Sequence, residues 1–253
     1  MDEQLKSAYE KKILSKINKK QNMTSEEILH EITSIDLKPS LLIMSGGLDT
    51  TTLLYLLVEK GIPLMVLSFD YGQMAVKEIE LAKTHCEKFR IEQKVVKISE
   101  SYIDGNLGKD GDIYHFDSVL IPNRNSVFLS IGVSYALQHG FERVYYGATK
   151  SSPDYADCQP RYVHQFNILN MVSDLREVQI RAPFIDMDKT EIIDLAIDLG
   201  VDLTKTWSCY NNTEKPCGVC DACILRKEDE REYLQELNKK TRAVQSSLNN
   251  YEK

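Results

Sequence analysis

The sequence has no apolar stretch of the roughly 18 or more residues that a membrane-spanning helix needs. Its first twenty residues, MDEQLKSAYEKKILSKINKK, also lack the apolar core of a secretory signal peptide. These two absences argue against a membrane protein and against a secreted protein. We therefore expect a cytoplasmic protein that makes no membrane contact.

Basic residues are too few for a protein that holds nucleic acid mainly through a large basic face. The chain has 31 Lys and Arg against 38 Asp and Glu, a formal net charge of -7. The first twenty residues are locally basic, and a solvated helix face is the preferred interpretation of such a charge run. We expect no stable, direct binding of nucleic acid.

What is present is the composition of a soluble globular protein: 253 residues, 42% hydrophobic and 27% charged. That length suits one large α/β domain with additions. Residues 1–39 read as a helical N-terminal extension, with apolar residues every four positions and capping-box spacing between Thr24 and Glu27. Pro39 closes this extension.

From residue 40 onward, short apolar runs alternate with helical patterns. The expected strands are 41–44, 63–69, 93–98, 143–147 and 178–183, and the expected helices are 50–60, 75–89, 125–139, 161–175 and 189–199. This alternation predicts an α/β fold with an open parallel sheet covered on both faces, similar to a Rossmann fold. We divide the chain into the extension, an α/β domain at 40–205, and a segment at 206–253 with the cysteine cluster. Within that segment, residues 228–253 are expected to form a helix and then a frayed tail.

A glycine pair follows the first expected strand, in SGGLDTTT at residues 45–52. Gly46 and Gly47 allow close approach of the backbone to an anion and a positive φ. The helix that starts near Asp49 directs free N–H groups and its positive dipole end to the same place. Hydroxyl donors come from Ser45, Thr50 and Thr51. The site is suited to phosphate oxygens, although an ordinary tight turn is the alternative for a glycine pair alone.

The loop is neither a Walker A motif nor a dinucleotide fingerprint. Its order Ser-Gly-Gly-x-Asp-Thr resembles the Ser-Gly-Gly-x-Asp-Ser loop of the ATP pyrophosphatase, or PP-loop, superfamily. That resemblance implies that the loop binds the pyrophosphate of ATP and that the 40–205 domain is an ATP-binding domain. The implied ATP-binding residues of the loop are Met44, Ser45, Gly46, Gly47, Leu48, Asp49, Thr50 and Thr51.

Four of the six cysteines lie close together near the C-terminal end, at Cys209, Cys217, Cys220 and Cys223. In a reducing compartment such a cluster indicates metal ligands before disulfides. Four thiolates suit a closed tetrahedral structural zinc site. An iron–sulfur cluster is the alternative, because it also takes four cysteines. Cys86 is expected in the core.

Further motifs in a fixed order narrow the resemblance. They are SFDYGQ at 68–73, IPNRN at 121–125, DYADCQP at 154–160 and DKTEII at 188–193. With the glycine loop and the cysteines, they make residues 41–227 similar to the 7-cyano-7-deazaguanine synthase family. The resemblance implies an ATP-dependent carbon–nitrogen ligase. It would adenylate the carboxylate of 7-carboxy-7-deazaguanine, convert it with ammonia to the amide, and dehydrate the amide to the nitrile with a second ATP.

The resemblance also implies roles for individual residues, with ATP, Mg²⁺ and Zn²⁺ as cofactors. The implied catalytic residues are Ser45, Asp49, Arg124, Lys189 and Cys158, with Asp49 the carboxylate nearest Mg²⁺ and Cys158 a possible nucleophile. Phe69 and Tyr71 would shape the adenine pocket, although Phe69 could equally be core. The implied substrate-binding residues are Gln73, Asn123, Arg124, Asn125, Tyr155, Asp157, Gln159 and Arg161. A homodimer is also expected.

Three departures from the family pattern keep other functions open. Gln159 stands where the family has an arginine, for which Arg161 could compensate. The extension at residues 1–38 precedes the usual start, and no glutaminase domain supplies nitrogen, so free ammonia is the expected donor. One alternative is a specialised relative, for example in bacterial defence, that stops at the amide or joins the base to a partner protein docked on residues 1–38. The others are a tRNA-modifying PP-loop enzyme and a non-catalytic nucleotide-binding zinc scaffold.

Overall fold

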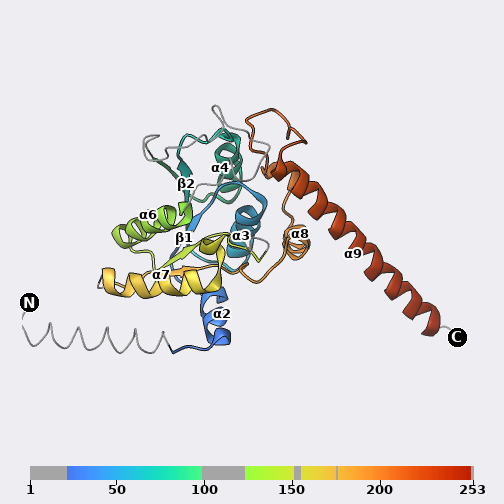
Figure 1. Ribbon diagram of the computed structural model, residues 1–253, viewed down its shortest axis with the longest axis horizontal. Helices are drawn as coiled ribbons and strands as arrows, with labels where there is room; N and C mark the ends of the chain where they lie inside the picture. Colours follow the sequence, from blue (N-terminus) through green and yellow to red (C-terminus); the bar gives the residue numbers. More distant parts are fainter. Residues whose placement is uncertain (1–21, 99–122, 151–154, 175, 252–253) are drawn as a thin grey trace, which may run out of the picture.

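A computed structural model describes residues 22–98, 123–150, 155–174 and 176–251 (Figure 1). Its five described strands form one parallel sheet in the order β3-β2-β1-β4-β5. They are β1 Ser40–Ile43, β2 Leu64–Asp70, β3 Gln93–Lys97, β4 Arg143–Tyr145 and β5 Gln179–Arg181. The predicted open parallel sheet is therefore confirmed. The helical pattern expected in residues 1–20 lies outside the described residues.

Helices cover both faces of the sheet. One face is packed by α3 Leu48–Glu59, α4 Lys77–Phe89 and α8 Lys189–Asp198, and the other by α6 Arg124–His139, α7 Pro160–Ser173 and the N-terminal α2 Ser25–Thr33. Two short 3-10 helices, Ala156–Cys158 (η2) and Leu203–Lys205 (η3), lie in the connections. Each face of the sheet has its own hydrophobic core. Cys86 of α4 lies in the core between the sheet and α3, α4 and α8, where it is 1% exposed, as predicted. The five helices expected between residues 50 and 199 are all present, with ends shifted by a few residues.

The strand order changes direction at β1. From β1 the chain builds outward through β2 and β3, and then returns to the other side of β1 for β4 and β5. In open α/β sheets, such a reversal leaves a crevice beyond the carboxyl ends of the two central strands. The glycine loop follows β1, so this topology places it at that crevice.

The described part of the extension packs on the sheet domain. The predicted capping box is present: Glu27 N donates to Thr24 Oγ1 at 3.3 Å, and Thr24 N donates to Glu27 Oε2 at 2.8 Å. From α2, Ile28 and Leu29 pack against the core next to α7 and β5. The capping box therefore fixes the start of a helix whose apolar face is buried.

The C-terminal helix is longer than the sequence predicted. α9 spans Asp221–Tyr251, so it begins inside the cysteine cluster and replaces the expected frayed tail over the described residues. An aspartate in the first turn suits the positive helix end, and the following residues are good helix formers. Tyr233 on α9 donates to Asp194 Oδ1 of α8 at 3.2 Å, and beyond this contact α9 projects from the body (Figure 1). None of the described helices combines the length and apolar character of a membrane span.

Asn167 of α7 pairs with the outer edge of β5. Its Nδ2 donates to Ile180 O at 3.0 Å, and its Oδ1 accepts from Ile180 N at 2.7 Å. Asn167→Ala would leave a buried N–H and C=O unpaired, each costing about 1–3 kcal/mol. We expect the free energy of unfolding, measured by urea titration, to fall by roughly 2–6 kcal/mol. Leu169→Ala, at a position 54% exposed on the same helix, is the control; equal stability of the two variants would contradict the role of Asn167.

Candidate functional site

A cavity of about 400 Å³ lies beyond the carboxyl ends of the central strands. Its walls come from the glycine loop, the segment after β2, the first turns of α4 and α6, the exit of β4, and the segment that carries the cysteines. Met44, at the end of β1, lines its floor although it is 1% exposed. The cavity therefore occupies the crevice that the strand order predicts.

The two glycines of the loop have different conformations. Gly46 has φ +100°, and a Cβ placed on it would lie 2.0 Å from Glu78 O of α4. Gly47 is the residue before α3 and has φ -71°, so a positive φ occurs at Gly46 alone. Gly46 is thus required both by its backbone angle and by the contact with α4.

Hydroxyl groups surround the start of α3. Ser45 Oγ and Thr50 Oγ1 are 3.2 Å apart, and Gly47 N donates to Ser45 Oγ at 3.1 Å. These three residues line the cavity. Leu48 and Thr51 instead lie on the buried side of α3, where Thr51 is 0% exposed. Their side chains are placed in the protein interior, and Thr51 N donates to Gly47 O at 3.0 Å within the helix.

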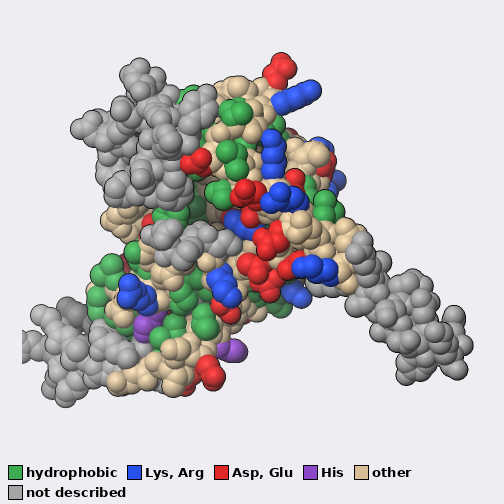
Figure 2. Space-filling model, turned by 45° about the vertical axis from the view of Figure 1, so that its right-hand side comes forward, with side chains coloured by type: hydrophobic (Ala, Val, Ile, Leu, Met, Phe, Trp, Pro, Cys, Tyr) green, Lys and Arg blue, Asp and Glu red, His purple; other side chains and the backbone are tan. Residues whose placement is uncertain are grey.

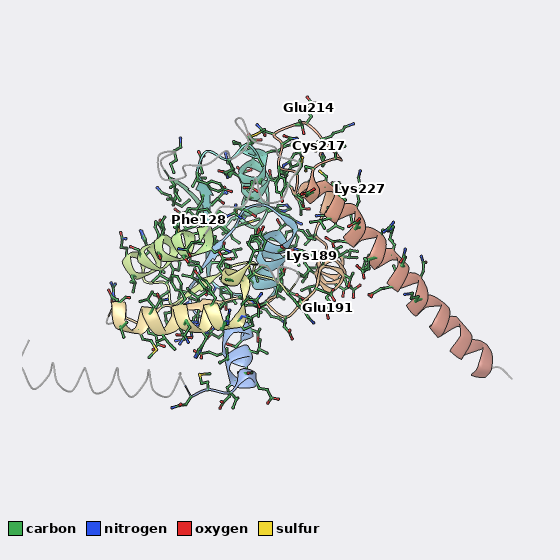
Figure 3. The ribbon with its side chains drawn as sticks, viewed as in Figure 1. Phe128, Lys189, Glu191, Glu214, Cys217 and Lys227 are labelled. Atoms are coloured by element: carbon green, nitrogen blue, oxygen red, sulfur yellow. The ribbon has the colours of Figure 1, made fainter. Side chains whose placement is uncertain are left out.

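Lys189 and Asp49 form an ion pair at the edge of the loop. Lys189 Nζ lies 2.7 Å and 2.6 Å from the two carboxylate oxygens of Asp49, and both side chains are 25% exposed. Lys189 is the first residue of α8, where Asp188 and Glu191 form a capping box (Figure 3). The fold thus brings two predicted catalytic residues, 140 positions apart, to one place.

Aromatic side chains form another part of the cavity lining. Phe69 stacks on Phe128 of α6 with ring centroids 4.2 Å apart and planes 4° apart, and Tyr71 lies 5.4 Å from the same ring. Arg124 Nη1 donates to the Tyr71 hydroxyl at 3.2 Å. Sequence reasoning missed Phe128, whose only signal is its position one helical turn after Arg124. These rings offer flat apolar surface next to a guanidinium group.

The DYADC motif meets the start of α6. Asn125 N donates to Asp157 Oδ2 at 3.4 Å, and Asn125 Nδ2 lies 3.7 Å from Cys158 Sγ. Tyr155, Asn125 and Cys158 line the cavity, whereas Asp157 does not. Burial raises the pKa of Cys158 to about 12. Because the thiolate is the nucleophilic form, this burial disfavours a nucleophilic role for Cys158.

Gln73 lines the cavity, but its side-chain amide makes hydrogen bonds to neighbouring residues between β2 and α4. Its Oε1 accepts from Tyr71 N at 2.9 Å, and its Nε2 donates to Phe69 O at 3.0 Å and to Glu78 Oε1 at 3.2 Å. Gln73 therefore holds the turn between β2 and α4 in shape.

Three other predicted substrate residues lie outside the cavity lining. Asn123 precedes α6 at φ +60° and accepts a hydrogen bond from Ser126 Oγ, and Gln159 precedes α7. Arg161 is exposed in the first turn of α7. This placement gives no support to the idea that Arg161 replaces the family arginine at position 159.

Glu78 is a cavity residue that the sequence analysis did not single out. It lies in the first turn of α4 and belongs to the cavity lining. Burial raises the pKa of Glu78 to about 7, while the hydrogen bond from Gln73 and the charge of Arg124 act in the opposite direction. Its signal in the sequence was its position five residues after Gln73, in the first helical turn beyond SFDYGQ.

The four predicted metal ligands converge. The sulfur atoms of Cys209, Cys217, Cys220 and Cys223 all lie within 4.8 Å of one another. Two of these separations are 4.0 Å and 3.9 Å. A tetrahedral ion with metal–sulfur bonds of about 2.3 Å sets its sulfurs about 3.8 Å apart. The cluster therefore fits a single metal ion.

Backbone N–H groups also prepare these sulfurs for a metal. Asn211 N and Cys217 N both donate to Cys209 Sγ at 3.4 Å. Such bonds favour the thiolate, which is the form that ligates a metal.

The cysteine segment is tied to the glycine loop. Trp207 N donates to Gly46 O at 3.1 Å, and Lys77 of α4 donates to Glu214 O at 2.6 Å. Lys77 Nζ also lies 4.9 Å from the Trp207 ring centroid. Tyr210 from this segment lines the cavity. The metal cluster and the cavity thus share one wall.

Charges on the outer surface are mixed. On the face in Figure 2, Lys and Arg side chains lie among Asp and Glu side chains instead of forming a continuous basic patch. Among the described residues that line the cavity, Arg124 is the one with a cationic side chain. The described cavity lining thus pairs one cationic side chain with two carboxylic acids, Asp49 and Glu78.

Comparison with known proteins identifies the family. Residues 39–234 match the family model "Queuosine biosynthesis protein QueC". The chain is 37% identical over 203 residues to 7-cyano-7-deazaguanine synthase of Psychromonas ingrahamii, covering 76% of this chain and 92% of that protein. It is 39% identical over 197 residues to 7-cyano-7-deazaguanine synthase 1 of Colwellia psychrerythraea, covering 74% and 90%. These matches and the glycine loop at the strand crossover show that the chain belongs to the QueC family.

Proposed function

We propose that this protein is an ATP-dependent ligase that converts 7-carboxy-7-deazaguanine and ammonia into 7-cyano-7-deazaguanine through the amide. The observation that carries the proposal is the Ser-Gly-Gly loop with its Asp49–Lys189 pair, opening on an aromatic cavity. Relatives named for this synthase activity match the chain over about nine tenths of their own length, 92% in one case. A carboxylate oxygen is a poor leaving group, and adenylation makes it a good one.

The loop end of the cavity would receive the phosphates of ATP. The start of α3 offers backbone N–H groups, and Ser45 and Thr50 offer hydroxyls, to the pyrophosphate that leaves during adenylation. Mg²⁺ in nucleotide sites is commonly bound by one or two carboxylates together with phosphate oxygens. Asp49 would supply the carboxylate here. Bound Mg²⁺ would neutralise negative charge on the phosphates. Lys189 would then be free to turn from Asp49 toward a phosphate oxygen.

The aromatic end would receive the two ring systems. Phe69 and Tyr71 offer flat surface for adenine, and Tyr155 offers a face for the deazaguanine ring. Arg124 would hold the substrate carboxylate or the adenylate phosphate. Asp157 could accept from the guanine-like edge only after releasing Asn125 N.

We propose zinc for the four-cysteine cluster. The sulfur separations of 3.9 Å and 4.0 Å suit one ion, whereas an iron–sulfur cluster bonds its cysteines to different irons and needs a wider cage. Metal analysis of the purified protein should give one zinc per chain and a colourless solution. Iron with visible absorption would point to the cluster instead.

The test of the main activity is the mass spectrum of the product. The protein is incubated with ATP, Mg²⁺, 7-carboxy-7-deazaguanine and ammonia, and AMP and pyrophosphate are measured alongside. The nitrile, with AMP and pyrophosphate, is the expected outcome. Amide without nitrile would indicate a specialised enzyme, and absence of AMP would contradict the ligase activity.

The remaining proposals concern assembly and setting. We propose a homodimer in the cytoplasm, to be checked by light scattering and fractionation. A protein partner on residues 1–38 stays a prediction, and residues 1–21 of that segment lie outside the described structure. The comparisons give no support to the conjugating, tRNA-modifying or non-catalytic alternatives.

A further inference from the structure

We propose that Glu78, a residue of the cavity lining next to the glycine loop, accepts the proton released when ammonia attacks the activated carboxylate. This inference rests on the proposed function. The amine nitrogen becomes cationic as it bonds to the acyl carbon, and it must lose a proton before the amide is stable. A proton acceptor within the cavity therefore has a defined task.

The other titratable side chains of the cavity are unsuited to this task. Among the described lining residues, those with a titratable side chain are Asp49, Tyr71, Glu78, Arg124, Tyr146, Tyr155, Cys158, Cys209 and Tyr210, with no histidine. Both oxygens of Asp49 are taken by Lys189. Cys209 belongs to the metal cluster, and Arg124 stays protonated.

The tyrosines and Cys158 hold their protons too tightly. Burial raises the pKa of Tyr155 and of Cys158 to about 12, and it also raises the pKa of each of the other three cavity tyrosines above its ordinary value. At neutral pH these groups are protonated and cannot accept. Glu78 is the carboxyl that remains.

Glu78 is placed beside the phosphate site. Its carbonyl oxygen lies 2.0 Å from where a Cβ of Gly46 would be, so the first turn of α4 rests directly on the glycine loop. Its Oε1 accepts from Gln73 Nε2 at 3.2 Å, which fixes the direction of the carboxyl. An acyl-adenylate formed at the loop would present its carbonyl carbon to the same cavity.

The groups around Glu78 act on the pKa of its carboxyl in opposite directions. Arg124 faces it from α6, Tyr71 faces it from the segment after β2, and Gln73 is neutral. Burial raises the pKa of Glu78 to about 7, with Gln73 and Arg124 opposing that rise. A carboxyl of this kind is divided between its two forms at neutral pH, which suits a group that takes up and then releases a proton.

The step balances in atoms and electrons. The nitrogen lone pair of ammonia forms the C–N bond while the carbonyl π pair moves to oxygen. An N–H proton passes to the Glu78 carboxylate. The carbonyl then re-forms, the C–O bond to phosphate breaks, and its electron pair leaves on AMP. Glu78 later gives its proton to water.

The test separates the two half-reactions in the full-length, metal-loaded enzyme. Glu78→Gln keeps the size of the side chain and removes the base. We expect its substrate-dependent ATP–pyrophosphate exchange without ammonia to stay within about twofold of wild type, and its amide formation to fall about 10²-fold or more. Glu80→Gln, at an exposed position of the same helix, should change neither rate. Glu78→Asp, which keeps a carboxyl, should recover part of the amide rate.

The pH profile gives a readout that a purely structural role would not move. Because the ionised form is the acceptor, the ratio of wild-type to Glu78→Gln amide rates should rise as pH increases through about 7. Wild-type exchange combined with an unchanged amide rate in Glu78→Gln would overturn this inference alone. An equal loss of exchange and amide formation in that variant would also overturn it. A wild-type protein without exchange would overturn the proposed function and this inference with it.

Discussion

The Gly46→Ala variant is expected to lose at least about 10²-fold in ATP affinity and to unfold at a lower temperature. A residue with a side chain at φ +100° is strained by roughly 1–3 kcal/mol. The added Cβ would also lie 2.0 Å from a backbone oxygen of α4, which cannot rotate away like a side chain. Either the loop or α4 must shift, and both form walls of the phosphate site. Calorimetric titration with ATP and thermal unfolding measure the two effects.

Gly61→Ala is the matched control for this variant. Gly61 also has a positive φ, +71°, but a Cβ there meets nothing within 4 Å. It should cost roughly 1–2 kcal/mol of stability and leave ATP affinity unchanged. The difference between the two variants isolates the contact with α4. ATP binding by Gly46→Ala at wild-type affinity would show that the loop does not hold the phosphates.

Cys220→Ser should release the metal and weaken ATP binding together. Cys220 is fully buried, and its sulfur lies 3.9 Å from that of Cys209. Structural zinc binds with a free energy on the order of 10 kcal/mol, so its loss should lower Tm by about 10 °C or more. Because Trp207 N holds Gly46 O at 3.1 Å, loosening this segment should also disturb the glycine loop. Metal content, thermal unfolding and calorimetry with ATP give the three readouts.

Cys86→Ala controls for the loss of a thiol. Cys86 is buried in the core formed by α3 and α4, away from the metal cluster. This variant should lose some stability through the cavity it leaves and keep its full metal content and ATP affinity. If Cys220→Ser lost its metal but bound ATP as well as wild type, the metal segment would be a separate structural unit. Retention of the metal would instead contradict the four-cysteine assignment.

The sequence by itself determined the features that depend on local order. Alternating apolar runs and helical patterns predicted the strands and helices of the sheet domain, because each needs only its own hydrophobic face. The order Ser-Gly-Gly-x-Asp-Thr predicted the phosphate site, and the spacing of four cysteines predicted a cluster whose sulfurs do converge. α9 was misread at its start, since a cysteine-rich stretch resembles a loop until the ligands fold the chain into a helical turn.

Only the tertiary structure decided which side chains meet. Asp49 and Lys189 are brought together from α3 and α8, and Phe128 of α6 stacks on Phe69, which lies at the end of β2. Glu78 acquires its role because α4 rests on the glycine loop, a contact between segments that local spacing does not encode. Such encounters depend on the strand order and on helix packing. Neighbouring residues on a helix point in different directions. Thr50 therefore lines the cavity, whereas the side chain of Thr51 is buried in the interior.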